Sequence, residues 1–580
     1  MRPSSKIIGG LAVFIGRHSE GPSGVDIWAG GHNVGNQSFT RGAIILATAS
    51  AFSRLLGFVY IVVLPRLIYD QGMGLIQMVR PIYNFAVILS IAGLPVAISK
   101  LVAEQLALGS TRGALTVFRW ALAIMLTLGT VFTGILAFGG RWLVTVIVRD
   151  LMAYPALMAM TPAVLILATV AAFRGLFQGL QYMTPTAVSQ VTEQICRVTS
   201  MLVFAILLKP LGVEYGAAGA SLGTTVGSVG GLVVIIMYYV AWRRSQSSAL
   251  GREPGPAPIA GWDVLKQLFA LSIPMVLGAI LWPTMQMIDT GLVPLRMQSA
   301  GYSRDAIRES LGYLGMALSL MYLPNVLTSA LGVTLVPAVA AADATGAHHQ
   351  VHRRISEALR ITFLFGLPSG VGLFCLAGPA SHLVFGYPQV AAPLQILAAG
   401  TLSVGIFQVC SGVLQGLGLV FLPVKSLVFG VAVKFALNYY LTALPGLGIK
   451  GAAWGTVGGL VAACLLNLLA VSRHTGVRID WQELLIKPLI VTLVMGLAVM
   501  LAYDKLSDLA EALLKPPNWE QARLLAAHNG LATAGTSVIG IVVYFIGLVG
   551  TGALYQRDVN MLPKIGVTLG TWLSRRGWVK

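Results

Sequence analysis

The sequence predicts an all-α integral membrane protein with about fourteen transmembrane helices, arranged as two six-helix lobes in a pseudo-twofold arrangement plus two C-terminal helices. Three observations support this fold class: the composition, a series of long apolar segments, and an internal repeat. The 580 residues are 56% hydrophobic and only 10% charged, whereas a typical soluble domain is about 25% charged. The mean hydropathy of +0.80 is therefore that of a chain that crosses a membrane many times.

Long apolar segments follow one another from about residue 42 onward, each long enough to span a bilayer as a helix. An even number of crossings places both termini on one side. Lys and Arg are about twice as frequent in the segments that would then face the cytoplasm as in the external ones, so we expect both termini to be cytoplasmic. The same asymmetry explains the net charge of +18, and no nucleic-acid partner is expected. The segments lie at about 42–69, 81–107, 115–138, 153–180, 185–209, 217–241, 265–294, 312–341, 356–378, 390–418, 421–444, 450–472, 485–503 and 531–555.

An internal repeat divides the chain into two halves. Gly175-Leu-Phe-Gln-Gly-Leu180 recurs as Gly412-Val-Leu-Gln-Gly-Leu417, and Gly216-Ala-Ala-Gly-Ala-Ser-Leu-Gly-Thr224 recurs as Gly448-Ile-Lys-Gly-Ala-Ala-Trp-Gly-Thr456. Six-helix halves of parallel topology usually hold a substrate site between them. The predicted organisation is a flexible cytoplasmic extension (1–40), an N-terminal lobe (41–243), a Pro/Gly/Ser-rich cytoplasmic linker (244–262), a C-terminal lobe (263–473), two further transmembrane helices (474–560) and a basic cytoplasmic tail (561–580).

An arginine lies near the middle of the first apolar segment. A charge at the centre of a bilayer costs about 2.5–3.5 kcal/mol on insertion scales, and such residues usually face a water-filled cavity or a paired acid. Arg54 therefore predicts a polar, basic interior that forms a pathway for something charged.

Four further ionisable residues fall well inside the predicted helices. Glu193 and Arg197 share one helix face, either as a static ion pair or as cavity residues. Asp289 lies on the seventh segment, which the repeat places opposite the first, so a pair with Arg54 or a shared cavity is expected. Lys434 could line the same cavity, together with Asn438 one turn later. Arg80 and Arg296 lie near external helix ends, and each is either a further substrate contact or, as we favour, an interfacial residue.

The excess of bases over acids favours an anionic substrate, because a guanidinium group binds phosphate through two parallel hydrogen bonds. Gly93 with Pro95, and Pro337 in the other half, are candidate hinges or packing kinks. No phosphate-binding loop for ATP occurs, so an ion gradient (Na⁺ or H⁺) or the membrane potential would supply energy. We expect no catalytic residues, no cofactor and no metal site, since the histidines at 348, 349 and 352 lie in a basic loop.

Several motifs together resemble the stage V sporulation protein B branch of the polysaccharide transporters, which is related to the MurJ-type lipid II flippases in the multidrug/oligosaccharidyl-lipid/polysaccharide (MOP) exporter superfamily. The resemblance covers nearly the whole chain from about residue 40. The motifs are Ser53-Arg54-Leu-Leu-Gly57-Phe58, Gly72-Met-Gly-Leu-Ile-Gln77-Met, Ala92-Gly93-Leu-Pro95-Val-Ala-Ile-Ser99-Lys100, Ile288-Asp289-Thr-Gly-Leu-Val-Pro294 and Gly301-Tyr-Ser303.

This resemblance implies alternating-access movement of an undecaprenyl-diphosphate-linked saccharide, with lipid II as the expected cargo, across the bacterial cytoplasmic membrane. It also implies that Arg54 matches a cavity arginine of the first helix, whereas Tyr60 stands where MurJ-type proteins have a second one. The last two helices would form a groove for the lipid tail. Membrane lipids are the other expected partners, and a monomer is the expected oligomeric state.

Three alternatives stay open. The first is export of another lipid-linked glycan, such as a teichoic-type polymer. The second is multidrug export of the MATE type, which would favour an acid-dominated cavity. The third is a non-transporting membrane scaffold in envelope or spore assembly, in which the cavity charges could be neutralised without loss of function.

Overall fold

The structure, a computed structural model, describes residues 39–246, 260–477, 480–513 and 521–553. Within these ranges every regular element is a helix, which confirms the all-α prediction. Twelve helices are long and apolar enough to cross a membrane, or 13 if the bent pair Pro388–Ala398 and Thr401–Gly416 counts as one span. Residues 1–38 of the predicted extension (1–40), the central part of the linker (244–262) and the basic tail (561–580) lie outside the described residues, whereas residues 39 and 40 already belong to the first helix.

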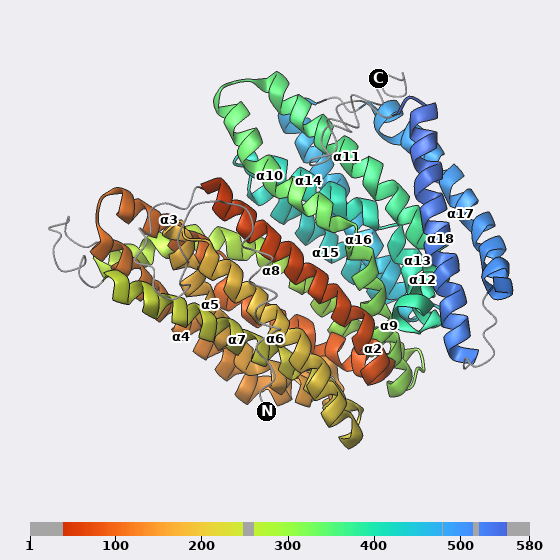
Figure 1. The fold of residues 1–580 in the computed structure, drawn as a ribbon, viewed down its shortest axis with the longest axis horizontal. Coiled ribbons are helices and arrows are strands. Elements are labelled where there is room, and N and C mark those ends of the chain that lie inside the picture. Colours follow the sequence, from red (N-terminus) through yellow and green to blue (C-terminus); the bar gives the residue numbers. More distant parts are fainter. Residues whose placement is uncertain (1–38, 247–259, 478–479, 514–520, 554–580) are drawn as a thin grey trace, which may run out of the picture.

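Two groups of helices form the body of the molecule, and a pair of helices lies at its right-hand edge in Figure 1. The N-lobe consists of α2 (Phe39–Ile91), α3 (Leu94–Ala107), α4 (Thr111–Leu143), η1 (Val144–Val148), η2 (Leu151–Ala153), α5 (Tyr154–Gly179), α6 (Thr184–Leu208), η3 (Lys209–Leu211) and α7 (Val213–Gln246). The C-lobe consists of α8 (Gly261–Ser299), α9 (Arg304–Tyr322), α10 (Asn325–Ala344), α11 (His348–Cys375), α12 (Ala377–Phe385), η4 (Pro388–Val390), α13 (Ala391–Ala398), α14 (Thr401–Gly416), α15 (Phe421–Leu441) and α16 (Ile449–Thr475). The edge pair follows η5 (Gln482–Ile486) and consists of α17 (Lys487–Leu513) and α18 (Gln521–Gly550), which pack on α11 and α12.

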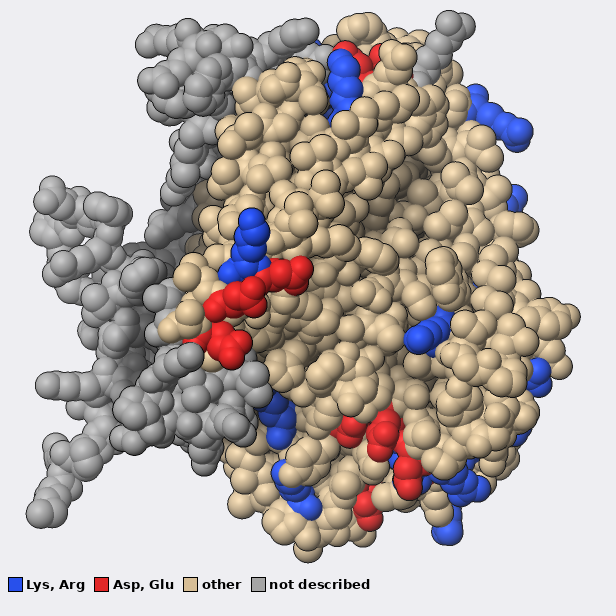
Figure 2. Space-filling view, turned by 90° about the vertical axis from the view of Figure 1, so that its right-hand side faces the viewer, with Lys and Arg blue, Asp and Glu red and all other residues tan. Residues whose placement is uncertain are grey.

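The surface over the edge pair is mostly uncharged. In Figure 2, which looks onto this side, tan residues cover most of the face. One group of acidic and basic side chains lies at mid-height beside the grey residues, and most of the others lie near the upper, lower and right-hand edges. A largely uncharged face with most charges near its edges is the pattern expected of a surface in contact with lipid tails.

The long helix α2 is two helices joined at Tyr69. Tyr69 has φ 63° and ψ 177°, which is not helical. The membrane-crossing segment Ile44–Ala107, of which α2 forms most, has 64 residues, about three times the length needed for one crossing. The total of fourteen crossings nevertheless stays a prediction.

The gap between the predicted segments 42–69 and 81–107 implied a loop at 70–80, and this prediction is wrong. The second part of α2 begins directly after Tyr69. Its polar residues suggested a loop, but they bond to the other lobe: Tyr313 donates to Asp70 at 2.6 Å, and Gln71 donates to Glu309 at 3.0 Å. The predicted segment 312–341 missed the start of α9 at Arg304 and ran across the break between α9 and α10. The segment 485–503 missed the end of α17 at Leu513, because polar helix ends fall outside an apolar window.

The internal repeat corresponds to matched packing in the two lobes. On α5, a methyl group at Gly175 would lie 3.0 Å from the carbonyl oxygen of Pro95 on α3. On α14, a methyl group at Gly412 would lie 2.1 Å from the carbonyl oxygen of Gly332 on α10. The repeated glycines therefore let equivalent helix pairs approach until their backbones touch.

The predicted breaks in the two lobes are not equivalent. Gly93 has φ +77° and separates α2 from α3, with Pro95 in the first turn of α3. Pro337, in contrast, lies inside α10, which continues from Asn325 to Ala344. The corresponding break in the C-lobe occurs earlier, between α9 and α10, so a hinge at Pro337 would have to work within a continuous helix.

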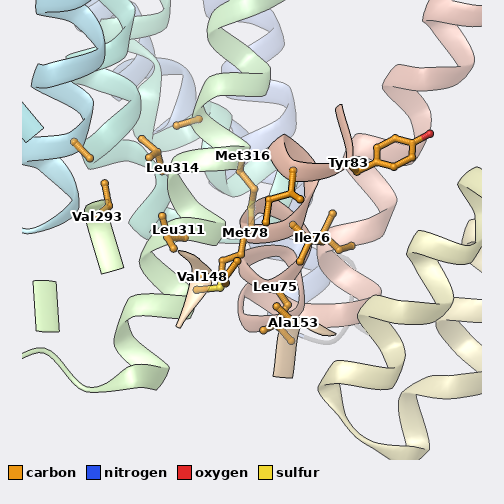
Figure 3. Packing of buried hydrophobic residues seen from close by; sticks show 14 of the residues in the cluster. Leu75, Ile76, Met78, Tyr83, Val148, Ala153, Val293, Leu311, Leu314 and Met316 are labelled. Atoms are coloured by element: carbon orange, nitrogen blue, oxygen red, sulfur yellow. The ribbon is translucent and has the colours of Figure 1, made fainter. Parts of the chain in front are cut away.

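A single cluster of buried apolar residues runs through both lobes. Figure 3 shows its centre, where side chains of α2 and α9 gather between the two helices and Tyr83 projects to one side. This packing seals the interface between the lobes at that level. The central members are Leu75, Ile76 and Met78 of α2, Leu311, Leu314 and Met316 of α9, and Val148, Ala153 and Val293.

Candidate functional site: a basic cavity beside a closed interface

The second part of α2 and α9 touch through their backbones. A methyl group at Gly74 would lie 1.9 Å from the carbonyl oxygen of Arg308, and one at Gly312 would lie 2.3 Å from the carbonyl oxygen of Asp70. Both distances are far below van der Waals contact, so only glycine fits. The two lobes are therefore in direct contact here.

Polar side chains hold the same contact together. Arg308 of α9 bonds the Asp150 carboxylate through two nitrogens, one of them at 3.0 Å, and it also reaches Asp305 at 2.7 Å. The hydrogen bond to Asp150 raises the pKa of Arg308, so this guanidinium stays charged. We call Asp70, Asp150, Arg308 and Tyr313 the interlobe latch. It joins residues from 70 to 313 in sequence and closes one side of the interface.

A polar cavity of about 390 Å³ lies within the N-lobe. It is formed by the first part of α2, by the end of α5 and by α6. Its volume falls in the range of small-molecule sites. The lining residues are Leu46, Ser50, Ser53, Arg174, Gln178, Thr186, Gln190, Glu193, Gln194 and Arg197.

A carboxylate held by two arginines dominates this cavity. Glu193 accepts from Arg174 at 2.8 Å through one oxygen and from Arg197 through the other. The predicted Glu193–Arg197 pair therefore exists. Arg174 was not among the predicted site residues, because it lies close to the end of the predicted segment 153–180 and not in its middle. The signal that could have found it is its place directly before the repeated Gly175 motif, inside the predicted span.

Arg54 lies beside this cavity on α2. It follows Ser53, which lines the cavity, and it comes one helical turn after Ser50. Its side chain is exposed, and it forms no hydrogen bond or ion pair with any residue that the structure describes. Arg54 is thus a guanidinium available to a ligand.

Arg80 lies at the interface between the lobes. It donates to the Tyr60 hydroxyl at 3.4 Å, a long hydrogen bond. A small cavity of about 60 Å³ is lined by Arg80 and by Asp289 of α8, among others. Arg80 therefore faces protein and an interlobe space, which favours the cavity interpretation over an interfacial one.

The acidic residue of the C-lobe has a different partner from the one expected. Asp289 accepts from Lys434 at 2.6 Å and from Asn438 at 3.0 Å. The side chains of Lys434 and Asp289 are 3% and 10% exposed. The expected Arg54–Asp289 pair is absent among the described contacts, because α15 brings an ammonium group to Asp289 first. The sequence could not reveal this contact, since it joins residues 145 positions apart.

The two lobes therefore differ in the balance of basic and acidic side chains in their interiors. In the C-lobe the ammonium and the carboxylate neutralise each other in a buried pair. In the N-lobe, Arg174 and Arg197 line the cavity with a single acid, Glu193, and Arg54 lies beside that cavity without a partner among the described residues. The basic excess predicted from the sequence is therefore concentrated on the N-lobe side.

Two solved structures share this architecture. The lipid II flippase MurJ, in an inward closed conformation, matches with a TM-score of 0.62 at 15% identity, over 87% of this chain and 98% of that chain. A multidrug resistance MATE family transporter of the MOP superfamily matches with a TM-score of 0.60 at 16% identity, over 72% of this chain and 94% of that chain. The fold of this chain is therefore the fold that these two membrane transporters share.

Sequence relatives give the family. Stage V sporulation protein B of Bacillus subtilis (strain 168) is 32% identical over 448 residues, covering 77% of this chain and 86% of that protein. Lipid II flippase MurJ of the same organism is 27% identical over 484 residues, covering 79% and 87%. The model of the polysaccharide biosynthesis protein family matches residues 39–342. The chain belongs to this family, which confirms the resemblance seen in its motifs.

Proposed function

We propose that this protein is a flippase that moves an undecaprenyl-diphosphate-linked saccharide, with lipid II as the expected cargo, across the bacterial cytoplasmic membrane. The observation that carries the proposal is the excess of arginine around the N-lobe cavity. A diphosphate carries at least two negative charges, and guanidinium groups in a partly dehydrated site bind it strongly. The name of one Bacillus relative, lipid II flippase MurJ, supports this class of cargo.

Arg54 is proposed as the first contact for the diphosphate. No existing ion pair of Arg54 has to break before it binds a ligand. Arg174, Arg197 and Lys434, in contrast, are already ion-paired. Arg80 and Asn438 are proposed as secondary contacts of the same pathway. The prenyl tail would stay in lipid, next to the uncharged surface of α17 and α18 (Figure 2).

Alternating access is the proposed mechanism. The latch closes one side of the interface between the lobes, which fits one end state of such a cycle. Opening there would require the contacts of Arg308 and Tyr313 to break. Both termini are proposed to be cytoplasmic, and the working unit is proposed to be a monomer.

Export of cationic drugs is the competing function within the same fold. A cationic substrate needs acids at its site, and the described N-lobe cavity has one acid that two arginines already neutralise. A different lipid-linked glycan would use the same diphosphate contacts, so the saccharide has to be decided by experiment.

The proposal is tested by lipid II translocation in cells depleted of their own flippase. Wild type should restore export, and Arg54→Ala at matched membrane levels should lose it. Arg353→Ala is the control, because Arg353 is an exposed arginine of α11 that contacts only Glu357 among the described residues. Full export by Arg54→Ala contradicts the role of Arg54. No export by any variant, with all present in the membrane, contradicts lipid II as cargo and moves another glycan, or a scaffold role, to the front.

A further inference from the structure

We propose that Glu193 is a built-in substitute for the substrate anion: in the empty protein it occupies the place between Arg174 and Arg197 that a diphosphate group takes when it binds. The inference rests on the proposed function for the class of ligand. It adds that the anion site lies between α5 and α6, and that binding exchanges one anion for another.

Glu193 accepts hydrogen bonds from only some of the nitrogen donors of the two guanidinium groups. Each gives the carboxylate one terminal nitrogen, and the Nε of Arg174 and the Nε of Arg197 are both buried without a hydrogen-bond partner among the described residues. A buried donor without a partner costs about 1–3 kcal/mol. A ligand with more oxygens than a carboxylate could accept from the Nε and a terminal nitrogen of the same arginine, and so satisfy both.

The walls of the cavity offer further unused donors. Thr186 and Ser53 line the cavity, and their hydroxyl oxygens are buried and have no partner within the described part of the chain. Thr186 is 2% exposed and Ser53 is 9% exposed. Four lining residues thus each have a polar atom without a partner, on α2, α5 and α6, around one space. Unsatisfied polar atoms gathered in the residues around one cavity are the feature expected of a site that a ligand completes, after a small rotation of these side chains.

Glu193 stabilises the two arginines when the site is empty. Without it, Arg174 and Arg197 would face each other as like charges in a partly buried space. A monoanionic carboxylate relieves this repulsion but fills few of the donors. A diphosphate carries more charge and more acceptor oxygens, so it can displace the carboxylate, whereas an anion no better than a carboxylate cannot. Glu193 is therefore proposed to select diphosphates, because only an anion that binds the two arginines more strongly than a carboxylate does can displace it.

The test measures binding to the purified full chain in detergent by calorimetry, with inorganic pyrophosphate and farnesyl diphosphate as probes. Glu193→Gln removes the competing charge, and we expect about tenfold tighter binding of both probes. The matched control is Glu357→Gln, since Glu357 also lies between two arginines, Arg353 and Arg354, but on α11 away from the cavity. It should leave the affinity unchanged. Equal or weaker binding by Glu193→Gln would show that Glu193 only positions the arginines, and would overturn the proposal.

A second pair of variants keeps the test decisive if Glu193→Gln does not fold. Thr186→Val and Ser53→Ala leave all the charges in place and remove only the unused donors. Each should weaken pyrophosphate binding about threefold or more, and an unchanged affinity in both would contradict the site. Tighter binding of farnesyl diphosphate than of pyrophosphate identifies a lipid-linked ligand, whereas equal binding identifies a free diphosphate. Because neither readout needs translocation, failure of the flippase assay with intact binding would reject the cargo and leave this site standing.

Discussion

Arg197 and Lys434 occupy equivalent places in the two lobes, 237 positions apart in the sequence. Each packs closely against a glycine of the following helix. A methyl group at Gly227 would lie 2.6 Å from the Cβ of Arg197, and one at Gly459 would lie 2.8 Å from the Cβ of Lys434. The acids are not equivalent. Glu193 comes from the same helix as Arg197, whereas Asp289 comes from α8 and reaches Lys434 across a helix interface. The two halves of the repeat thus share the basic residue, but the acidic residue that pairs with it comes from a different helix in each half.

The first prediction concerns the sealed pair of the C-lobe. Lys434→Met would leave the Asp289 carboxylate buried without its cation, and we expect a loss of about 3–5 kcal/mol of folding free energy. Thermal unfolding in detergent measures it. The double variant Lys434→Met, Asp289→Asn should recover much of the loss, because no isolated charge remains. A single variant as stable as the double one would argue against a buried, energetically coupled pair.

The second prediction uses the equivalent position in the N-lobe. Arg197→Met removes a cation from Glu193, but Arg174 remains at 2.8 Å and the cavity admits water. The expected loss is about 1 kcal/mol, well below that of Lys434→Met. The same unfolding measurement checks it. Equal losses at the two positions would mean that the N-lobe cluster is as closed as the C-lobe pair.

The third prediction concerns the break between α2 and α3. Gly93 has φ +77°, and a methyl group there would lie 2.8 Å from the Cβ of Met275 on α8. Gly93→Ala should therefore cost backbone strain of about 1–2 kcal/mol plus a steric clash. Gly109→Ala is the control, because Gly109 has φ +74° but no neighbour within 4 Å. The difference between their melting temperatures isolates the clash, and no difference would mean that α8 can yield at Gly93.

The sequence predicted those features that depend on local composition. Apolar length gave the helices, and the spacing of Glu193 and Arg197 gave their ion pair, because both are properties of a single segment. It did not predict contacts between segments. Lys434 with Asp289, and Arg174 with Glu193, are joined only by the packing of different helices. Asp70 and Gln71 were placed in a loop for the same reason, since their partners lie on α9.

The final prediction concerns the backbone contact between α2 and α9. A methyl group at Gly74 would lie 1.9 Å from the carbonyl oxygen of Arg308, a backbone atom that cannot move aside alone. Normal contact needs about 3.5 Å, so Gly74→Ala should force the two lobes apart by about 1.5 Å or more at the latch. It should also weaken the Arg308–Asp150 ion pair and shift the protein away from the state with this side closed.

Spin labels at Trp142→Cys on α4 and Arg304→Cys on α9, both exposed sites, would report this opening by pulsed electron resonance once the four native cysteines are replaced. In Gly74→Ala the distance distribution should move to longer values. Asp150→Asn, which weakens the ion pair and leaves the glycine contact, should broaden it toward the same values. Gly139→Ala on α4 is the control, because nothing lies within 4 Å of its added methyl group. If Gly74→Ala and Gly139→Ala gave the same distribution, the α2–α9 contact would not hold the lobes together, and closure would have to depend on the apolar cluster of Figure 3 alone.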